Sequence, residues 1–449
     1  MLFPYFALIL LFSLISLRKQ RQSYYFFWIY EKKVVILRCF SSVNMILYFC
    51  LIYIAAFFGH RKARLLVQGQ RETQRRLREG SNIYKDCIWF HAASVGEFEQ
   101  ARPIIERLKA EQPQQKILLT FFSPSGYEMR KHYDKADFVL YLPFATRRNA
   151  KRFVEAVCPR KVIFVKYEFW PAYLRLFKQK RIPAYSISAI FRPTQLFFRP
   201  WGKAYLDLLH CFRHIYVQDS ESLRLLQSHG ITHCSVAGDT RFDRVNYLAT
   251  HAAAPDGALL PFEVPEKLLV AGSTWPQDEA LLARYVDSHP DVSLLVVPHE
   301  ITDSHLHEIF QLFHGRYLCL SEMECHRHLT PAPRVVVVDK MGLLSRLYRY
   351  GQVAYVGGGF GAGIHNTIEA AVYGMPVVFG PKYQHFREAK ALIAAGAGFS
   401  VRNYQELERA MDNSFAHAEA LGLKARLYVE SELGATDTIY QDLFKTRKS

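Results

Sequence analysis

Residues 87–97, with the sequence CIWFHAASVGE, decide the fold class of this chain. The first four are apolar, and the segment that follows carries apolar residues at helical spacing through Ile104, Ile105 and Leu108. This order predicts a strand, a turn of small residues and a helix that begins close to Glu97. Because the turn is built of small residues, a ligand can approach the backbone there closely.

Glu97 has two interpretations at this position. In an open α/β sheet, the turn after a strand lies at the mouth of a cleft, where a carboxylate is well placed to act as a general base. A glutamate in the first turn of a helix also stabilises the positive end of the helix dipole without any role in catalysis. The turn by itself leaves both interpretations open.

The same alternation of short apolar runs and helical patterns continues along the chain. Expected strands before residue 250 are 87–91, 116–121, 137–141, 161–165, 183–187, 213–217 and 234–236. After a stretch rich in proline, expected strands are 268–271, 292–297, 334–338, 352–356, 376–379 and 398–401. Strands that alternate with helices predict parallel sheets with right-handed crossovers. We therefore expect an α/β protein with two doubly wound domains, 61–250 and 266–449, a linker over 251–265, and a cleft at the carboxyl ends of the strands.

The first sixty residues suggest contact with a membrane. Two apolar stretches, 2–17 and 45–58, are each followed by basic residues. Both are short of the roughly 20 residues that a comfortable span needs, and two consecutive spans would conflict with the positive-inside rule. We expect that residues 1–44 are a doubtful extension, that Met45 is the true start, and that 45–60 form a single membrane anchor. A buried core helix is the alternative for the second stretch.

The net charge of the chain limits the kinds of molecule that it is expected to bind. The chain has 449 residues, a formal charge of +16 and a sequence pI of about 9.4. Such a surplus of base suits a phosphorylated substrate or an anionic membrane surface. Nucleic acid ranks last, since no nucleic-acid-binding motif is present. Cys319, Cys325, His326 and His328 match no common zinc spacing, so no metal is expected.

Three loops in the second half predict a site for an anion. They are Gly272-Ser273-Thr274-Trp275-Pro276, Pro298-His299-Glu300, and the glycine-rich run 357–366, each after an expected strand. Glycines expose backbone N–H groups, and a helix start adds partial positive charge. The third loop lacks the Gly-Lys-Ser/Thr of a Walker loop and is no clean dinucleotide fingerprint, which disfavours a dehydrogenase.

Asn366 and Glu369 lie three residues apart and share one helix face. In the mouth of a cleft, Glu369 could accept hydrogen bonds from ribose hydroxyls. The pair also fits a helix cap with a capping-box partner, which needs no ligand. The spacing alone does not decide between these interpretations.

Seven segments, in order along the chain, resemble the motifs of bacterial 3-deoxy-D-manno-octulosonic acid (Kdo) transferases. Residues 91–97 resemble the family's H-A-x-S-V-G-E, and 363–370 resemble G-G-H-N-x-L-E-P. The others are 123–128 for T-P-T-G, 168–171 for E-x-W-P, 238–243 for G-N-x-K-F-D, 271–274 for A-G-S-T and 339–343 for D-T-M-G-E-L. One match would be weak, but the ordered set is specific.

The resemblance implies a GT-B fold, made of two Rossmann-like domains that face a cleft, with an N-terminal membrane anchor. It implies an inverting glycosyltransferase that moves Kdo from CMP-Kdo to a lipid A precursor of the lipid IVA type without an obligatory metal or cofactor. The protein would sit at the inner-membrane surface, with its catalytic body in the cytoplasm. By this resemblance Glu97 is the general base. The CMP-binding set comprises Gly272, Ser273, Thr274, Pro298, His299, Met341, Gly342, Leu343, Asn366, Thr367, Ile368 and Glu369.

Two further catalytic candidates follow from the motifs. Arg241 is expected to meet the charge on the leaving phosphate, together with the N–H groups of the glycine loop. Glu168 is expected to orient Arg241 or the Kdo; the alternative is an ion pair that serves structure alone.

The chain departs from the family pattern at several places. The family's P-R-H is reduced to Pro298-His299, which puts one phosphate contact in doubt, and its Lys before Phe-Asp is Arg241. Only the second acid of E-T-E survives, as Glu168, and Leu343 replaces the Glu of M-G-E-L. The arginine-rich segment of the family is replaced by residues 188–193. Contacts with the acceptor are therefore expected to differ from those of other members.

Two rival functions stay open on the sequence. One is another GT-B glycosyltransferase that uses a UDP-sugar on a lipid or cell-wall acceptor. The other is a membrane-tethered binding protein that kept the fold and lost catalysis. The number of Kdo residues added and the oligomeric state cannot be inferred from these motifs.

Overall fold

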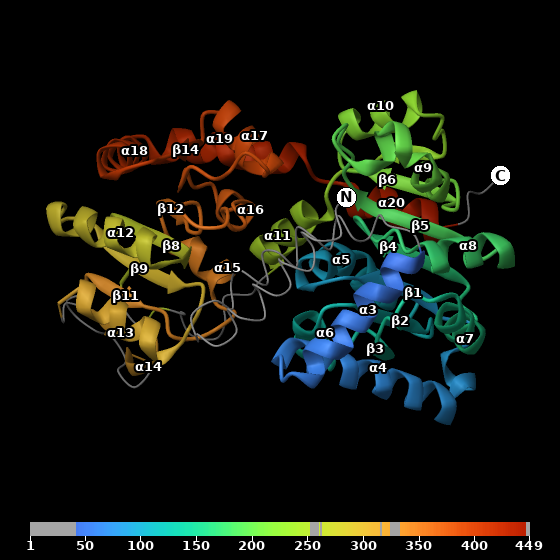
Figure 1. Ribbon diagram of the computed structural model, residues 1–449. Helices are drawn as coiled ribbons and strands as arrows, with labels where there is room; N and C mark the ends of the chain where they lie inside the picture. The colour runs from blue at the N-terminus through green and yellow to red at the C-terminus, as the bar shows by residue number, and fades with distance from the viewer. Residues whose placement is uncertain (1–41, 252–259, 261–262, 315–316, 324–332, 446–449) are drawn as a thin grey trace. The chain divides into compact units, whose positions relative to one another are not determined.

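A computed structural model of the chain describes residues 42–251, 260, 263–314, 317–323 and 333–445. Contacts within the chain divide it into two compact units (Figure 1). Unit 1 runs up to Gly238 and takes up the chain again from Thr436, whereas unit 2 comprises Asp239–Ala435. Each unit has its own parallel sheet.

Unit 1 contains a seven-stranded sheet in the order β3-β2-β1-β4-β5-β6-β7. Neighbouring strands are parallel, and the chain reverses its direction of winding between β1 and β4, where a doubly wound sheet opens a crevice. The strands are β1 Ile88–Ala92, β2 Ile117–Phe121, β3 Phe138–Tyr141, β4 Lys161–Val165, β5 Ala184–Ala189, β6 His214–Val217 and β7 Cys234–Val236. The helices are α3 Ser42–Phe57, α4 Arg61–Glu79, α5 Val95–Glu111, α6 Pro124–Arg130, α7 Arg147–Val157, α8 Pro171–Lys180, α9 Lys203–Leu209, α10 Ser220–Ser228 and α20 Ala435–Phe444.

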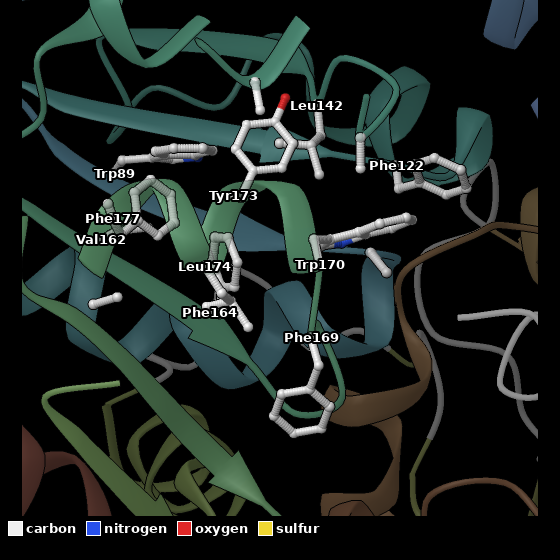
Figure 2. Packing of buried hydrophobic residues seen from close by; sticks show 14 of the residues in the cluster. Trp89, Phe122, Leu142, Val162, Phe164, Phe169, Trp170, Tyr173, Leu174 and Phe177 are labelled. Carbon is white, nitrogen blue, oxygen red and sulfur yellow. The ribbon is translucent and has the colours of Figure 1, made fainter. Parts of the chain in front are cut away.

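Aromatic side chains fill one face of this sheet. Trp89 on β1 contacts Tyr173 and Phe177 of α8, with ring centroids 5.8 and 5.5 Å apart (Figure 2). The other face is filled by apolar residues of α5 and by Ile439, Tyr440 and Leu443 of α20. Because every residue of β1 is buried, helices must cover both faces of the strand, as expected in a parallel sheet.

Unit 2 repeats the architecture with the order β10-β11-β9-β8-β12-β13-β14. Its crevice position lies between β8 and β12. The strands are β8 Leu268–Thr274, β9 Ser293–Pro298, β10 Leu318–Cys319, β11 Val335–Val337, β12 Val353–Val356, β13 Val377–Phe379 and β14 Gly398–Ser400. The helices are α11 Thr240–His251, α12 Pro276–Ser288, α13 Asp303–Leu312, α14 Leu320–Met323, α15 Leu344–Leu347, α16 Ile368–Ala371, α17 Arg387–Ala394, α18 Tyr404–Ala416 and α19 Ala418–Ser431.

The thirteen strands expected from the sequence are confirmed, with ends that shift by up to three residues. The sequence analysis missed β10, which has only two residues and lies at the edge of its sheet, where no apolar run is needed. Strand β8 extends to Thr274 because an irregularity in its pairing with β9 carries the strand past Gly272.

The division between the units differs from the expected boundary at residue 250. Helix α11 belongs to unit 2, because Phe242 and Val245 pack into a core cluster of that unit. The last segment also differs from the expected 266–449 domain, since its apolar face fills the core of unit 1. The expected boundary was placed at a proline-rich stretch, on the basis of composition. The observed boundary depends instead on which of the two sheets each amphipathic helix packs against.

Helix α3 is shorter than a membrane-spanning helix and packs on protein, so it does not support the single-pass anchor expected over 45–60. It has 16 residues, and Phe49 and Ile52 are buried against unit 1. The ring of Phe49 stacks on Phe144, with centroids 4.3 Å apart. Across the described residues, no helix reaches the length and apolar character that a membrane crossing demands. One face of α3 packs on protein, so lipid cannot surround it.

Three expectations lie wholly or largely outside the described residues. They concern the extension over 1–44, the linker over 251–265 and the group Cys325, His326 and His328. Within the described ranges, no three His, Cys, Asp or Glu side chains are grouped so as to hold a metal ion.

Candidate active site

The crevice edge of unit 1 presents Glu97 at the start of α5. Ser94 occupies the N-cap position, and Glu97 is the third residue of the helix. The hydroxyl of Ser94 donates a hydrogen bond to Oε2 of Glu97, and it accepts none from a backbone N–H group of the helix. The side chain of Glu97 is only partly buried. It is thus held in one orientation while it stays within reach of a ligand.

A buried polar network lies beneath this edge. His91 and Glu168 are both almost completely inaccessible, and Nε2 of His91 lies 3.0 Å from Oε2 of Glu168. The indole N–H of Trp170 donates to the same oxygen at 2.6 Å. On its other side, Nδ1 of His91 lies 2.9 Å from the hydroxyl of Thr120. The network therefore ties the ends of β1, β2 and β4 together.

The contacts of Glu168 with His91 and Trp170 lie within unit 1. The carboxyl group is 1% exposed, and its Oε2 accepts from the indole N–H of Trp170 and lies 3.0 Å from Nε2 of His91. Its partners His91 and Trp170 belong to unit 1, whereas Arg241 belongs to unit 2 and has carboxylate partners of its own. Through His91, Glu168 contacts the strand that leads to the loop carrying Glu97, an arrangement that favours the structural alternative.

In unit 2 the glycines at the ends of β8 and β12 let two backbone segments touch. Ser273 has a φ of 54°, a left-handed conformation that costs energy for a residue other than glycine. A Cβ atom on Gly357 would lie 2.3 Å from the carbonyl oxygen of Ser273. One on Gly359 would lie 2.5 Å from Cα of Gly380. These glycines are needed for close packing of the loops that the sequence analysis assigned to the donor.

Asp278 joins the two loops. Its carboxyl group is 1% exposed and accepts hydrogen bonds from the backbone N–H of Gly358 at 2.9 Å and of Trp275 at 3.0 Å. The hydroxyl of Tyr355 on β12 donates to the other oxygen at 2.7 Å. Burial raises the pKa of Asp278, and these three donors oppose the rise.

Thr274 faces the interior and not the site. Its hydroxyl donates to Oε1 of the fully buried Glu279 at 2.8 Å, and Oε2 of Glu279 lies 3.0 Å from Nε2 of His305. Burial raises the pKa of Glu279 even though His305 opposes the shift. Three residues at the end of β8 were expected to bind the nucleotide-sugar. Gly272 and Ser273 set the backbone conformation there, and the side chain of Thr274 fixes the end of the strand to the interior.

Three rings gather at the ends of neighbouring strands. Trp275 follows β8, His299 follows β9, and His365 ends the glycine-rich loop after β12. The ring of His299 stacks on both of the others, with centroids 5.0 Å from Trp275 and 4.2 Å from His365. Burial lowers the pKa of His299, and burial together with His299 lowers the pKa of His365 to about 4.

Asn366 and Glu369 contact each other beside the start of α16, where Thr367 and not Asn366 takes the N-cap position, without a side-chain capping bond. Nδ2 of Asn366 donates to Oε1 of Glu369 at 2.9 Å, and Oδ1 of Asn366 accepts from the backbone N–H of Ile368 at 3.1 Å. Both side chains are partly exposed, whereas Thr367 and Ile368 are fully buried. A ligand can therefore meet Asn366 and Glu369, but not the side chains of the two residues between them.

The segment Met341-Gly342-Leu343 leads into the short helix α15. Met341 is 70% exposed, and Gly342 has a φ of 82° that favours glycine. Leu344 lies against Gly272, where an added Cβ would come within 2.7 Å of its side chain. This segment thus contacts the end of β8, and Leu343 contributes apolar packing there.

Arg241 is paired inside unit 2. Nε and Nη2 donate to Oδ2 of Asp239 at 2.9 and 2.7 Å, and Nη1 donates to Oε1 of Glu388 at 3.3 Å. Burial disfavours the charge of Arg241, but the attraction of the two acids outweighs it and raises the pKa. Much of the positive charge expected to face a phosphate is therefore balanced by two carboxylates.

Comparison with known proteins shows which family this chain is similar to. Residues 61–244 match the family of 3-deoxy-D-manno-octulosonic-acid transferases. The 3-deoxy-D-manno-octulosonic acid transferase of Aquifex aeolicus is 28% identical over 355 residues, which cover 78% of this chain and 90% of that protein. The corresponding protein of Chlamydia pneumoniae is 26% identical over 437 residues, 91% of this chain and 96% of its own length. The chain is therefore similar to Kdo transferases along most of its length, and this likeness supports a Kdo transferase of the GT-B type.

Solved structures with a similar fold support a GT-B architecture. UDP-GlcNAc 2-epimerase from Neisseria meningitidis has a TM-score of 0.57 at 16% identity, covering 81% of this chain and 100% of that chain. MurG of Acinetobacter baumannii has a TM-score of 0.52 at 13% identity, with the same coverage. At these identities the likeness concerns the fold alone.

Sequence reasoning missed three residues that shape the candidate site, namely Asp278, Trp275 and His365. Asp278 is the third residue of α12, and its spacing to Trp275 is that of a capping pair, so its capping contact could have been predicted. Its contacts with Gly358 and Tyr355 could not have been predicted, because they depend on the pairing of β8 with β12. Trp275 and His365 belonged to loops that we singled out, but nothing in the sequence indicates that they meet.

Proposed function

We propose that this protein transfers Kdo from CMP-Kdo to a sugar hydroxyl of a lipid A precursor of the lipid IVA type, with inversion at the anomeric carbon. Similarity to Kdo transferases supports the donor and the reaction class. The observation that carries the assignment of residues is the position of Glu97, partly exposed at the crevice edge of unit 1 and oriented by Ser94.

Glu97 acts as the general base in this proposal. The acceptor hydroxyl attacks the anomeric carbon of Kdo while its proton passes to the carboxylate, and the bond from that carbon to the phosphate oxygen of CMP breaks. Since Ser94 donates to Oε2, Oε1 is the atom left to receive the proton. General-base assistance of this kind contributes about 10²–10⁴-fold to the rate.

Unit 2 holds the donor. Asn366 and Glu369 are partly exposed and offer an amide and a carboxylate to the ribose hydroxyls. The glycine-rich loop, held in shape by Asp278 and by the close approach of Gly359 to Gly380, offers N–H groups to the leaving phosphate. With Arg241 paired to Asp239 and Glu388, we propose that these neutral donors supply most of the stabilisation of the leaving group.

The direct test is transfer from freshly prepared CMP-Kdo to a tetraacylated lipid A precursor by membranes that carry the full chain, with products identified by mass. We expect a product that is heavier by one or more Kdo residues. A folded protein that gives no such product would contradict the proposal. Protection against heat by UMP but not by CMP would favour the alternative enzyme, a GT-B transferase that uses a UDP-sugar.

We further propose that α3 and α4 hold the protein on an anionic inner-membrane surface, with the catalytic body on the cytoplasmic side. The outer side of α3 and the turn after it expose Tyr53, Ile54, Phe57 and Phe58, the last two by 83% and 70%. Helix α4 then exposes a run of basic side chains, namely Arg61, Lys62, Arg64, Arg71, Arg75, Arg76 and Arg78. Apolar insertion beside basic residues is typical of helices that lie in the membrane interface.

Replacement of both Phe57 and Phe58 by serine is expected to weaken binding to vesicles that contain anionic lipid by about 100-fold. The estimate takes about 1.5 kcal/mol for each ring that loses its apolar environment. Flotation or sedimentation with vesicles measures the change. The matched control is Leu423→Ser with Leu427→Ser, which removes two side chains of α19 that are 58% and 54% exposed. Equal effects of the two pairs would contradict a specific role of α3.

A further inference from the structure

In the ring cluster formed by Trp275, His299 and His365, one hydrogen bond determines which nitrogen of His365 carries the proton. The indole Nε1 of Trp275 lies 3.1 Å from Nε2 of His365 and donates to it. An indole N–H can only donate, so Nε2 of His365 must carry a lone pair and no proton. A neutral imidazole has one proton on its two nitrogens, which places that proton on Nδ1.

The surroundings keep His365 neutral. Burial, followed by the neighbouring imidazole of His299, lowers the pKa of His365 to about 4. Burial lowers the pKa of His299 and so favours its neutral form, although the charge of Glu300 acts in the opposite direction. Protonation of His365 at Nε2 would also place two N–H groups face to face with Trp275. Near neutral pH the ring therefore has one donor, Nδ1–H.

This donor is available to a ligand. In the part of the chain that the structure describes, Nδ1 of His365 has no hydrogen-bond partner, and the side chain is partly exposed. The backbone N–H of His365 donates to the carbonyl of Gly357, which fixes the ring at the end of the glycine-rich loop. His299 stacks on His365 with an interplanar angle of 23° and limits rotation of its ring.

We propose that Trp275 is a positioning residue, which fixes His365 as its Nδ1-protonated tautomer so that a neutral N–H group is aimed at the phosphodiester of the nucleotide-sugar donor. The proposal rests on the function given above and deepens it. The motif that lacks the family's arginine contributes to this arrangement, because the ring of His299 stacks on both Trp275 and His365.

Trp275→Phe separates this role from ring packing, because phenylalanine keeps an aromatic face for His299 and removes only the N–H. We expect the Kd for CMP and the KM for CMP-Kdo to rise about three- to tenfold, the range for loss of one well-placed hydrogen bond, with little change in kcat. The ¹⁵N NMR spectrum of the full chain labelled at histidine gives a readout independent of catalysis. Wild-type His365 should show a protonated Nδ1 and an unprotonated Nε2, and the variant should lose this preference.

Two substitutions of His365 provide the matched pair. An asparagine amide lies close to the position of Nδ1, whereas a glutamine amide reaches the position of Nε2. His365→Asn is therefore expected to keep CMP affinity within about threefold of wild type, and His365→Gln to lose it to the same extent as Trp275→Phe or more. Comparison of the spectra of the variants with wild type also assigns the His365 signals.

The outcomes separate this inference from the proposed function. An unchanged His365 tautomer in Trp275→Phe, or equal CMP affinity of the asparagine and glutamine variants, overturns the inference even if the wild type transfers Kdo. A wild type that neither binds CMP nor transfers Kdo overturns the proposed function, while the NMR experiment still decides whether Trp275 fixes the tautomer.

Discussion

Glu97→Gln is expected to lower kcat for Kdo transfer by about 10²–10⁴-fold and to leave the Kd for CMP unchanged. The amide has the same shape as the carboxylate but cannot accept the proton of the attacking hydroxyl. Because Ser94 can still hydrogen-bond to the amide oxygen, the start of α5 should keep its structure. Single-turnover transfer, with products separated by mass, and calorimetric titration with CMP measure the two quantities.

The matched control is Glu99→Gln, two residues further along α5. Glu99 pairs with Arg102 and Arg130, at 3.4 and 2.9 Å, and is not at the helix start. Its substitution should change kcat less than twofold, in keeping with the small energies of partly exposed ion pairs. If the Glu97 variant keeps wild-type activity, the glutamate serves only the helix dipole, the alternative that the sequence left open.

Asp278→Ala is expected to give the largest loss of stability among single substitutions in unit 2, about 3–5 kcal/mol. It leaves the backbone N–H groups of Gly358 and Trp275 and the hydroxyl of Tyr355 without their buried acceptor. Asp278→Asn should cost less, about 1–2 kcal/mol, because one oxygen remains to accept. Hydrogen exchange should accelerate first at the amides of Trp275 and Gly358.

The control for this prediction is Asp287→Ala on the same helix, where the side chain is exposed. It should shift stability by less than about 0.5 kcal/mol. Denaturant unfolding of the full chain, followed together with exchange, distinguishes a loss within unit 2 from a loss in unit 1. If the exchange rates at residues 275 and 358 are equal in Asp278→Ala and wild type, the carboxylate does not hold the two loops together.

The strands and the place of Glu97 were predictable because they depend on neighbours in sequence. An apolar run such as 88–92 can be buried only as a strand between layers, and the turn after it must then lie at the carboxyl edge of the sheet. Asn366 and Glu369 are three residues apart, so their contact too was within reach. The sequence analysis left a ligand site and a capping pair open there; the structure shows that the two side chains contact each other, with Thr367 at the N-cap.

The contacts that were out of reach join residues far apart in the chain. Glu168 was expected to orient Arg241 or the Kdo, and its contact with the buried His91, 77 positions earlier, was not foreseen. Asp278 meets Tyr355, also 77 positions away, and Trp275 meets His365 at a separation of 90. Such pairs are set by strand order and by the depth at which each side chain is buried, and neither can be obtained from local patterns.

The return of the chain to unit 1 through α20 has a consequence for biosynthesis. The ribosome releases Gly238 roughly 200 residues before it releases Thr436, an interval of about 10–40 s at common elongation rates. During that time the surface later covered by Ile439, Tyr440 and Leu443 has no covering helix. The first unit to leave the ribosome is thus the last to be completed, and a nascent chain that stops before residue 436 presents an apolar patch suited to chaperones.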